Sequence, residues 1–512
     1  MECRWILKDI GIGMEKSEKI VWLICSALAI VFVAMLLMFI TRKNVNNNVS
    51  AGSAAVSRNA AEATVNADVN EKAGAIDTIK EGDNTPLVSS KAGEPITINA
   101  SADSQSMDGD WLFAYGNQLY DASGKPVWLT GINWFGYNTG TNCFDGLWAC
   151  DLDSSIDAIA DHGFNLLRIP ISTELILQWK NGEYPDANFN QATNSYLVGM
   201  NSLEIFDHVL AKCKEDGIKV MLDVHCAKTD ASGHNYNVWF NGDITEESFI
   251  EAWVWVAERY KDDDTIIAFD LKNEPHGKPF EDNKAIWNDS DSEYNWKHVA
   301  EKTAAAIFEK NPNVLIVVEG LEIYPMDIST NGDYHSTDEK DYYFSWWGGN
   351  LRGVKDYPMN LGDFNNKLVY SPHDYGPTVY QQPWFYDGYN YDTLMADCWY
   401  DNWFFIYDED TAPILIGEWG GFMTEPNLTW MTHLRTLIGK YHLNYTFWCF
   451  NSNSGDTGGL VLDDFTTWDE EKYAFVKEVL WQQDGKFVGL DHETPLGANG
   501  ICLNDAKCED WK

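Results

Sequence analysis

Two glutamates lie at equivalent points of the sequence, each at the end of an apolar, β-branched run. Glu274 lies in 270-DLKNEPHG-277, and Glu418 ends 413-PILIGE-418. A buried strand ordinarily ends in small polar turn residues, so an acidic residue at this point suggests a chemical role. Two carboxyl groups brought together from different strands are typical of glycoside hydrolysis, in which one protonates the leaving oxygen and the other attacks the sugar carbon.

The segments that must position these glutamates alternate between strand-like and helix-like patterns after Trp111. The strand candidates are 127–132, 165–170, 218–224, 265–271, 314–319, 367–372, 413–418 and 445–450. The helix candidates are 153–162, 201–216, 246–261, 294–310, 393–407, 428–441 and 469–482. An aromatic-rich stretch replaces a clear helix between the fifth and sixth strands. This alternation predicts an α/β protein with a (β/α)8 TIM barrel.

In such a barrel the reacting groups lie at the carboxyl ends of the strands. The polar and aromatic residues at these ends are Arg168, His225, Asn273, Glu274, Glu319, His373, Tyr375, Glu418 and Trp448. Any one of them has an ordinary structural interpretation, because a single Arg usually pairs with a carboxylate and a single Glu often caps a helix. Their coincidence at one rim instead predicts an active site.

The neighbours of the two glutamates predict different roles for them. Arg168 and Tyr375 fall near Glu418 in barrel order; an Arg keeps a carboxylate ionised and a Tyr hydroxyl orients it. We therefore expect Glu418 to be the nucleophile. Glu274 follows Asn273, whose amide can bind the sugar hydroxyl next to the reacting carbon, so Glu274 is expected to be the acid.

The region from about Trp111 to about Lys486 resembles family 5 glycoside hydrolases, and among them the bacterial-type endo-β-1,4-glucanases. The motifs that carry the resemblance are 131-GINWFG-136, 166-LLRIP-170, 222-LDVH-225, 268-AFDLKNEPH-276, 346-WWGGNL-351, 370-YSPHDYG-376, 416-IGEWG-420, 446-TFWCFN-451 and 454-SGDTGGL-460. NEP alone is a weak signal, whereas NEP, HDY and GEWG in this order and spacing are specific. The resemblance implies the same barrel fold and retention of anomeric configuration by double displacement, with no cofactor and no metal.

The resemblance also assigns roles residue by residue. Glu274 matches the acid/base and Glu418 the nucleophile. The substrate-binding residues that it implies are Arg168, His225, Asn273, His373, Tyr375, Trp448 and Trp134, the last by stacking on a sugar face. Trp346 and Trp347 fit stacking and loop packing equally well.

The expected activity is cleavage of internal β-1,4-glucosidic bonds in cellulose or related β-glucans by a monomeric enzyme. A β-mannanase or mixed-linkage β-glucanase of the same family is the alternative within this chemistry. A catalytically silent glucan-binding wall protein is the alternative from a different class, and the presence of both glutamates argues against it.

Charge and composition narrow the choice of substrate. The formal net charge is −42, and 23 of the residues are Trp. Such acidity argues against nucleic acid, whose binding proteins carry basic patches, and against polyanionic polysaccharides. A neutral glucan is compatible with it, and Trp rings can stack on sugar faces, although acidic charge also keeps proteins soluble.

The amino-terminal part of the chain predicts a membrane attachment. The uncharged run at 20–40 is 21 residues long, which is enough to span a bilayer as a helix. We interpret 1–43 as a cytoplasmic stub with a transmembrane signal anchor, and a cleaved signal is the alternative. Residues 44–110 lack Phe, Trp, Tyr and Cys and predict a flexible linker. The catalytic domain, 111–490, would then be extracellular.

The cysteines predict disulfides if the domain lies outside the cytoplasm. Cys502 and Cys508 lie in the carboxyl-terminal tail, 491–512, and are close enough in sequence for a local bridge. In the loop that departs most from the family pattern, Cys143 has either Cys226 or Cys150 as its candidate partner.

Overall fold

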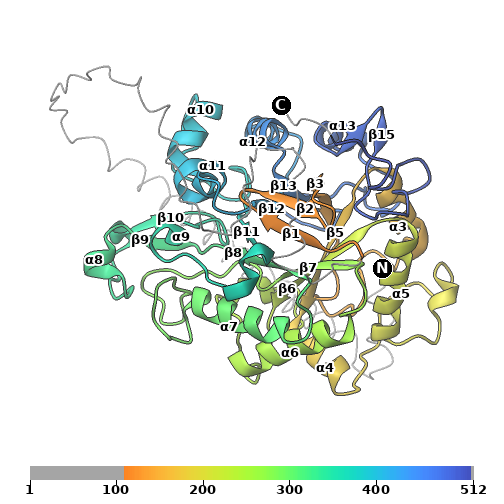
Figure 1. Ribbon diagram of the computed structural model, residues 1–512, viewed down its shortest axis with the longest axis horizontal. Helices are drawn as coiled ribbons and strands as arrows, with labels where there is room; N and C mark the ends of the chain where they lie inside the picture. Colours follow the sequence, from red (N-terminus) through yellow and green to blue (C-terminus); the bar gives the residue numbers. More distant parts are fainter. Residues whose placement is uncertain (1–108, 509–512) are drawn as a thin grey trace, which may run out of the picture. The chain divides into compact units, whose positions relative to one another are not determined.

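The computed structural model describes residues 109–508 (Figure 1). Its centre is a sheet of eight parallel strands in the order β11-β8-β7-β6-β5-β4-β13-β12. The strands are β4 (Thr130–Asn133), β5 (Leu166–Ser172), β6 (Lys219–Cys226), β7 (Ile266–Asp270), β8 (Leu315–Glu319), β11 (Leu368–Ser371), β12 (Leu415–Trp419) and β13 (Asn444–Phe447). Parallel bridges from Tyr370 to Ile414 and from His373 to Glu418 join the two end strands. The sheet therefore closes, which confirms the predicted (β/α)8 barrel.

Helices surround the barrel strands in Figure 1. They are α3 (Leu152–Asp161), α4 (Thr173–Lys180), α5 (Ser202–Glu215), α6 (Glu246–Arg259), α7 (Trp296–Phe308), α12 (Asn427–Tyr441) and α13 (Glu470–Lys477). Each buries an apolar stripe; in α5, for example, Phe206 and Val209 are fully buried. A capping box of Asn201 and Glu204 starts α5, as expected for a helix that begins directly after a loop. The strands are buried on both faces, which explains their near-continuous apolar sequences.

Two connections differ from a regular helix. Between β8 and β11 lie an antiparallel pair, β9 (Ile323–Pro325) and β10 (Tyr342–Phe344), and only short helices, as the weak pattern there predicts. These short helices are α8 (Ile328–Asn331), α9 (Gly353–Asp356) and the 3₁₀ segment η4 (Gly362–Lys367). Before β12, the predicted helix 393–407 is divided into α10 (Tyr391–Leu394), the π-helix η5 (Met395–Phe404) and α11 (Phe405–Asp408). Further 3₁₀ turns are η1 (Ser195–Leu197), η2 (Gly233–Asn235) and η3 (Glu339–Asp341).

The two ends of the described chain pack at the base of the barrel. An antiparallel sheet of β1 (Leu112–Tyr115), β2 (Gln118–Asp121) and β3 (Pro126–Val127) leads into β4. At the other end, α13 is followed by the hairpin of β14 (Gln482–Gln483) and β15 (Lys486–Phe487). Beyond it, Leu496, Leu503 and Ala506 are buried in the main hydrophobic core. Residues 491–508 therefore pack with the barrel. Asp110, which the sequence places in the linker, is also buried here.

Two further expectations concern cysteines and the membrane. All eight cysteines of residues 109–508 are free, so the predicted bridges between Cys502 and Cys508 and from Cys143 to Cys226 or Cys150 are wrong. Cys143 instead directs its thiol at the carbonyl oxygen of Asn188, at 3.3 Å. Within the described part of the chain, no helix has the length and apolar character needed to cross a bilayer. The predicted span at 20–40 and the linker up to 108 lie outside the described residues.

Candidate active site

Glu274 lies in the loop that follows β7 and has an unusual backbone conformation. Its φ is +51°, a left-handed value that is uncommon outside glycine and that occurs where the surroundings impose it. The backbone N–H of Glu274 donates to Glu319 Oε2 at 2.7 Å. The carboxyl group of Glu274 is thereby directed toward His373, where Oε1 lies 2.9 Å from Nδ1.

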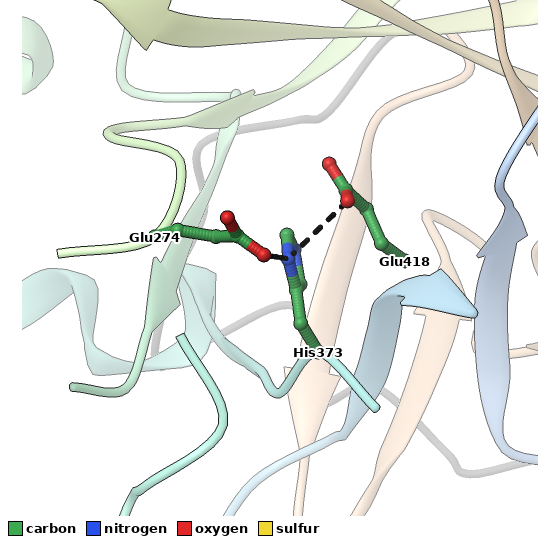
Figure 2. A group of neighbouring side chains, drawn as sticks. All are labelled: Glu274, His373 and Glu418. Atoms are coloured by element: carbon green, nitrogen blue, oxygen red, sulfur yellow. Dashed lines mark hydrogen bonds and ion pairs between the residues drawn. The ribbon is translucent and has the colours of Figure 1, made fainter. Parts of the chain in front are cut away.

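Glu418 lies on β12, on the other side of His373 (Figure 2). Arg168 Nη1 donates to Glu418 Oε1 at 2.8 Å. The hydroxyl of Tyr375 donates to Glu418 Oε2 at 2.6 Å. Both carboxylate oxygens are thus held by a donor, which fixes the orientation of the group. These two contacts are the ones that the predicted barrel order requires.

Arg168 is the residue that ties the strand ends together. Its guanidinium is fully buried, and four carboxylates lie within 3.2 Å of it. They belong to Asp223, Asp270, Glu319 and Glu418. The five-donor fork of an arginine suits such a set of acceptors.

Sequence reasoning missed several of these partners. Asp223 and Asp270 lie inside buried strands, and Asn133 accepts from Arg168 Nη1 at 3.0 Å. The available signal was a charged residue within an apolar run, in 222-LDV-224 and 269-FDL-271, since a buried charge needs a partner. Asn273, which was predicted, accepts from Arg168 Nη2 at 3.1 Å.

His373 connects the two predicted catalytic carboxyl groups. Figure 2 shows Glu274 and Glu418 reaching its ring from opposite sides. Nδ1 lies 2.9 Å from Glu274 Oε1 and 3.6 Å from Glu418 Oε2. One carboxylate oxygen of each glutamate and a ring nitrogen of His373 all lie within 4.8 Å of one another. The two carboxyl groups are therefore close enough to act on one sugar carbon.

The pKa values of the two glutamates differ, but their order is the reverse of the one that the predicted roles suggest. The acid, Glu274, should have the higher pKa, and the nucleophile, Glu418, the lower. Burial raises the pKa of Glu418 to about 7, although His373 and Arg168 act against this rise. Burial also disfavours the ionised form of Glu274, but the hydrogen bond and charge of His373 outweigh it and lower the pKa of Glu274 to about 2. The expectation that Arg168 keeps Glu418 ionised is thus corrected in part, because burial outweighs the lowering effects of His373 and Arg168 on its pKa.

His373 accounts for the low pKa of Glu274. Burial lowers the pKa of His373, but its neighbours Glu319, Glu418 and Glu274 outweigh burial and raise it well above the usual value. The proton nearest to Glu274 is therefore held on His373. Because the two groups share one hydrogen bond, they titrate as a pair.

An aromatic row borders the carboxyl groups. The ring of Trp448 is partly exposed and lies parallel to that of His225, with centroids 5.7 Å apart. Phe135 lies parallel to the same indole at 5.5 Å. Trp448 Nε1 donates to Ser454 Oγ at 3.0 Å, and His225 Nδ1 lies 2.7 Å from Asp223 Oδ2. The geometry thus brings the predicted His225 and Trp448 together at the site.

Trp134 does not join this row. Its side chain is fully buried, stacked on Phe144 at 4.1 Å and packed against Phe450 at 4.5 Å. Its indole N–H donates to the carbonyl oxygen of Asp145. A ring with both faces in the core cannot receive a sugar, so the structure corrects the prediction that Trp134 stacks on substrate.

The two tryptophans of the WWGG motif have different surroundings. Trp346 is buried among Tyr375, Trp384 and Phe385. Trp347 is partly exposed and stacks on His276 at 3.8 Å. Trp346 therefore packs in the loop, whereas part of the Trp347 ring is exposed and can contact a ligand.

The sequence and the fold both match known glycoside hydrolases. The model of the cellulase family, glycosyl hydrolase family 5, matches residues 120–454. The chain belongs to glycosyl hydrolase family 5. Endoglucanase G of Acetivibrio thermocellus is 50% identical over 448 residues, covering 81% of this chain and 78% of the relative. Endoglucanase B of the same organism is 48% identical over 438 residues, covering 79% and 78%.

Solved structures agree with this assignment. A cellotetraose complex of the endocellulase from Pyrococcus horikoshii has a TM-score of 0.64 and 32% identity, covering 74% of this chain and 100% of that one. The catalytic domain of the major endoglucanase from Xanthomonas campestris has a TM-score of 0.62 and 30% identity, covering 72% and 99%. The protein is accordingly an enzyme, a family 5 glycoside hydrolase of the cellulase type.

Proposed function

We propose that this enzyme cleaves internal β-1,4-glucosidic bonds of cellulose or related β-glucans by double displacement, with retention of anomeric configuration. The observation that carries the mechanism is the separation of the two carboxyl groups, whose oxygens approach within 4.8 Å. Retaining glycosidases have carboxyl groups about 5–5.5 Å apart, whereas inverting ones need about 6.5–9.5 Å to admit a water. The short separation favours direct attack by one carboxylate.

In the first step, Glu418 attacks the anomeric carbon and the glycosidic C–O bond breaks. The leaving oxygen takes a proton that passes from His373 to Glu274 through their contact at 2.9 Å, so Glu274 is ionised when the second step begins. In the second step, Glu274 removes a proton from water, and the water oxygen displaces Glu418. Arg168 and Tyr375 hold the two oxygens of Glu418, so the nucleophile needs little reorientation before attack.

The substrate proposal follows from the relatives and from charge. The relatives named endoglucanase are up to 50% identical over most of the chain, whereas a mannan endo-1,4-β-mannosidase of Aspergillus clavatus is 25% identical over 43% of it. A net charge of −42 also suits a neutral polymer. A β-mannanase or mixed-linkage β-glucanase is therefore the less favoured alternative.

The roles of the two carboxyl groups are tested with alanine variants and azide. Glu418→Ala cannot form the covalent intermediate, so added azide should restore turnover and give an α-glycosyl azide. Glu274→Ala should still form the intermediate on an activated aryl cellobioside, because a good leaving group needs no proton. Azide should then give a β-glycosyl azide.

The wild-type enzyme with azide is the control and should release only free sugar. The opposite stereochemistry in the two variants would show that the roles are reversed. Nearly full activity of either variant would contradict the glycosidase role of that residue.

The substrate is tested by release of reducing sugar from soluble cellulose derivatives, mixed-linkage glucan, mannan and xylan. Internal cleavage predicts that the viscosity of a soluble cellulose derivative falls faster than reducing ends appear. Faster turnover of mannan or mixed-linkage glucan than of the cellulose derivatives would favour the corresponding alternative activity.

We further propose that the catalytic domain is held outside the cytoplasm by the uncharged run at 20–40. The supporting observation is its length of 21 residues, which matches a bilayer. Membrane fractionation and terminal sequencing test this proposal. A mature chain that begins between Val45 and Asp110 would instead support a cleaved signal.

A further inference from the structure

Glu319 is a buried carboxylate that the mechanism above does not use. It is the last residue of β8 and is fully shielded from solvent. Its Oε2 accepts the backbone N–H of Glu274 at 2.7 Å. Its Oε1 lies 3.2 Å from Arg168 Nη2 and 3.2 Å from His373 Nε2. One side chain thus contacts the predicted acid/base, its histidine neighbour and the central arginine.

The loop above Glu319 is shaped around this carboxylate. Gly348, in the WWGG motif, has a φ of +72°, and a Cβ at this position would overlap Glu319 Oε2. The carbonyl oxygen of Gly348 accepts the backbone N–H of Gly320 at 2.9 Å. The carboxylate is therefore enclosed by backbone and cannot touch a sugar, so any effect on catalysis must pass through its neighbours.

The contacts of His373 determine what Glu319 can do. The ring has a carboxylate near each nitrogen: Nδ1 hydrogen-bonds with Glu274 at 2.9 Å, and Nε2 lies 3.2 Å from Glu319 Oε1 in an ion-pair contact that is not aligned as a hydrogen bond. A neutral imidazole has one N–H and one lone pair, and a lone pair facing a carboxylate oxygen is unfavourable. Only an imidazolium carries a proton on both nitrogens and a positive charge that attracts both carboxylates.

We propose that Glu319 is a positioning residue that keeps His373 doubly protonated beside Glu274 and holds the backbone of Glu274 in its left-handed conformation. The proposal rests on the proposed function, because it concerns the proton that Glu274 delivers. His373 then supplies the proton that Glu274 delivers to the leaving oxygen, and the proton that Glu274 takes from water in the second step returns the pair to its starting state.

The charged groups around His373 support this balance. Of its neighbours, Glu319 contributes most to raising its pKa against the lowering effect of burial. The ionisable groups whose charges act on His373 or on its carboxylate partners are Arg168, Asp223, Asp270, Lys272, Glu274, Glu319, Tyr375 and Glu418. Removing the charge of Glu319 leaves the other groups in place.

The test is the alkaline limb of the pH profile of kcat/KM, measured with Glu319→Gln on a soluble β-glucan. The amide keeps an acceptor for the N–H of Glu274 but removes the negative charge beside Nε2. The pair should then lose its last proton at lower pH, so the alkaline limb should move down by at least about one pH unit. Glu319→Asp, which keeps the charge, should restore the limb toward the wild-type position even if kcat falls.

Glu322→Gln is the matched control. Glu322 is also a buried glutamate in this loop, and it accepts the backbone N–H of Gly277 at 3.1 Å. It contacts Lys278 and none of the catalytic groups. Its amide variant should leave the alkaline limb unchanged, and an equal shift in both variants would overturn the proposal.

A direct measurement covers the case in which Glu319→Gln does not fold. In the wild-type enzyme labelled with ¹⁵N-histidine, the signals of His373 are identified by their loss in His373→Asn. Both ring nitrogens should carry protons at pH 7, and a neutral ring would overturn the proposal. An unchanged limb in Glu319→Gln would do the same. If the proposed function itself fails, the Glu274→Ala variant keeps its activity on poor leaving groups, which is a separate outcome.

Discussion

The hydroxyl of Tyr375 lies 2.6 Å from Glu418 Oε2, while Arg168 occupies the other oxygen of the same carboxylate at 2.8 Å. The tyrosine therefore holds the predicted nucleophile from one side only. Tyr375→Phe removes this donor and leaves the arginine contact. A hydrogen bond to a charged group contributes about 1.5–3 kcal/mol, so kcat should fall roughly 10- to 100-fold, with a smaller change in KM.

The control for this prediction is Tyr445→Phe. The hydroxyl of Tyr445 is also buried and donates to the carbonyl oxygen of Val479 at 3.2 Å. Steady-state kinetics on a soluble glucan should show a much smaller loss of kcat in this variant. Equal losses in the two variants would mean that Tyr375 acts only through stability.

Arg168 should be as important for folding as for chemistry. Arg168→Met leaves Asp223, Asp270 and Glu319 buried without their cation. Breaking a buried ion pair from one side costs about 3–5 kcal/mol, and denaturant unfolding should show a loss of that size. Arg259→Met is the control, because Arg259 and its partner Asp207 are both more than a third exposed and such pairs contribute about 0–1 kcal/mol.

The glutamates were predictable because strand ends can be located in a sequence. Apolar runs place the ends of β7 and β12 within a few residues, and Glu274 lies shortly after the first while Glu418 is the next-to-last residue of the second, Leu415–Trp419. The left-handed backbone of Glu274 was not predictable, because it depends on the acceptor that Glu319 provides from another strand. Glu319 itself was noted at a strand end, but its contacts arise only from closure of the barrel.

The wrong prediction for Trp134 shows a second limit of inference from the sequence. Asn133 contacts Arg168, whereas the next residue packs on Phe144. Adjacent side chains of a strand point in opposite directions, so proximity to a functional residue does not place a neighbour in the site. The connection from β8 to β11 has no helical periodicity to detect, because its apolar residues form a separate cluster around Ile323 and Tyr334.

Trp134 and Trp448 should respond differently to truncation. Trp134→Ala empties a core position and should cost about 3–5 kcal/mol of unfolding free energy, as measured by denaturant unfolding. Trp448→Ala removes a partly exposed ring beside His225, so kcat/KM on cellotetraose should fall more than stability. A stable Trp134→Ala variant with a raised KM would restore the predicted stacking role of Trp134.

His492 should make the stability of the domain depend on pH above neutrality. It lies at the base of the barrel, where Nδ1 pairs with Asp110 and Nε2 lies 3.1 Å from Asp121 Oδ2. Hydrogen bonds from Asp110 and then Asp121 raise the pKa of His492 to about 9, against the effect of burial. An unfolded histidine titrates near 6.5. The folded state therefore binds this proton more tightly than the unfolded state.

The sign of the effect follows from these two pKa values. The stabilisation is fully present below about pH 6.5 and is lost as the pH rises toward about 9. Within this window the unfolding free energy should fall by at most about 1.4 kcal/mol per pH unit from this group. Denaturant unfolding of His492→Gln should show a flatter pH dependence there, whereas the exposed control His335→Gln should keep the wild-type slope. A wild-type slope in His492→Gln would mean that Asp110 and Asp121 do not hold a charged histidine.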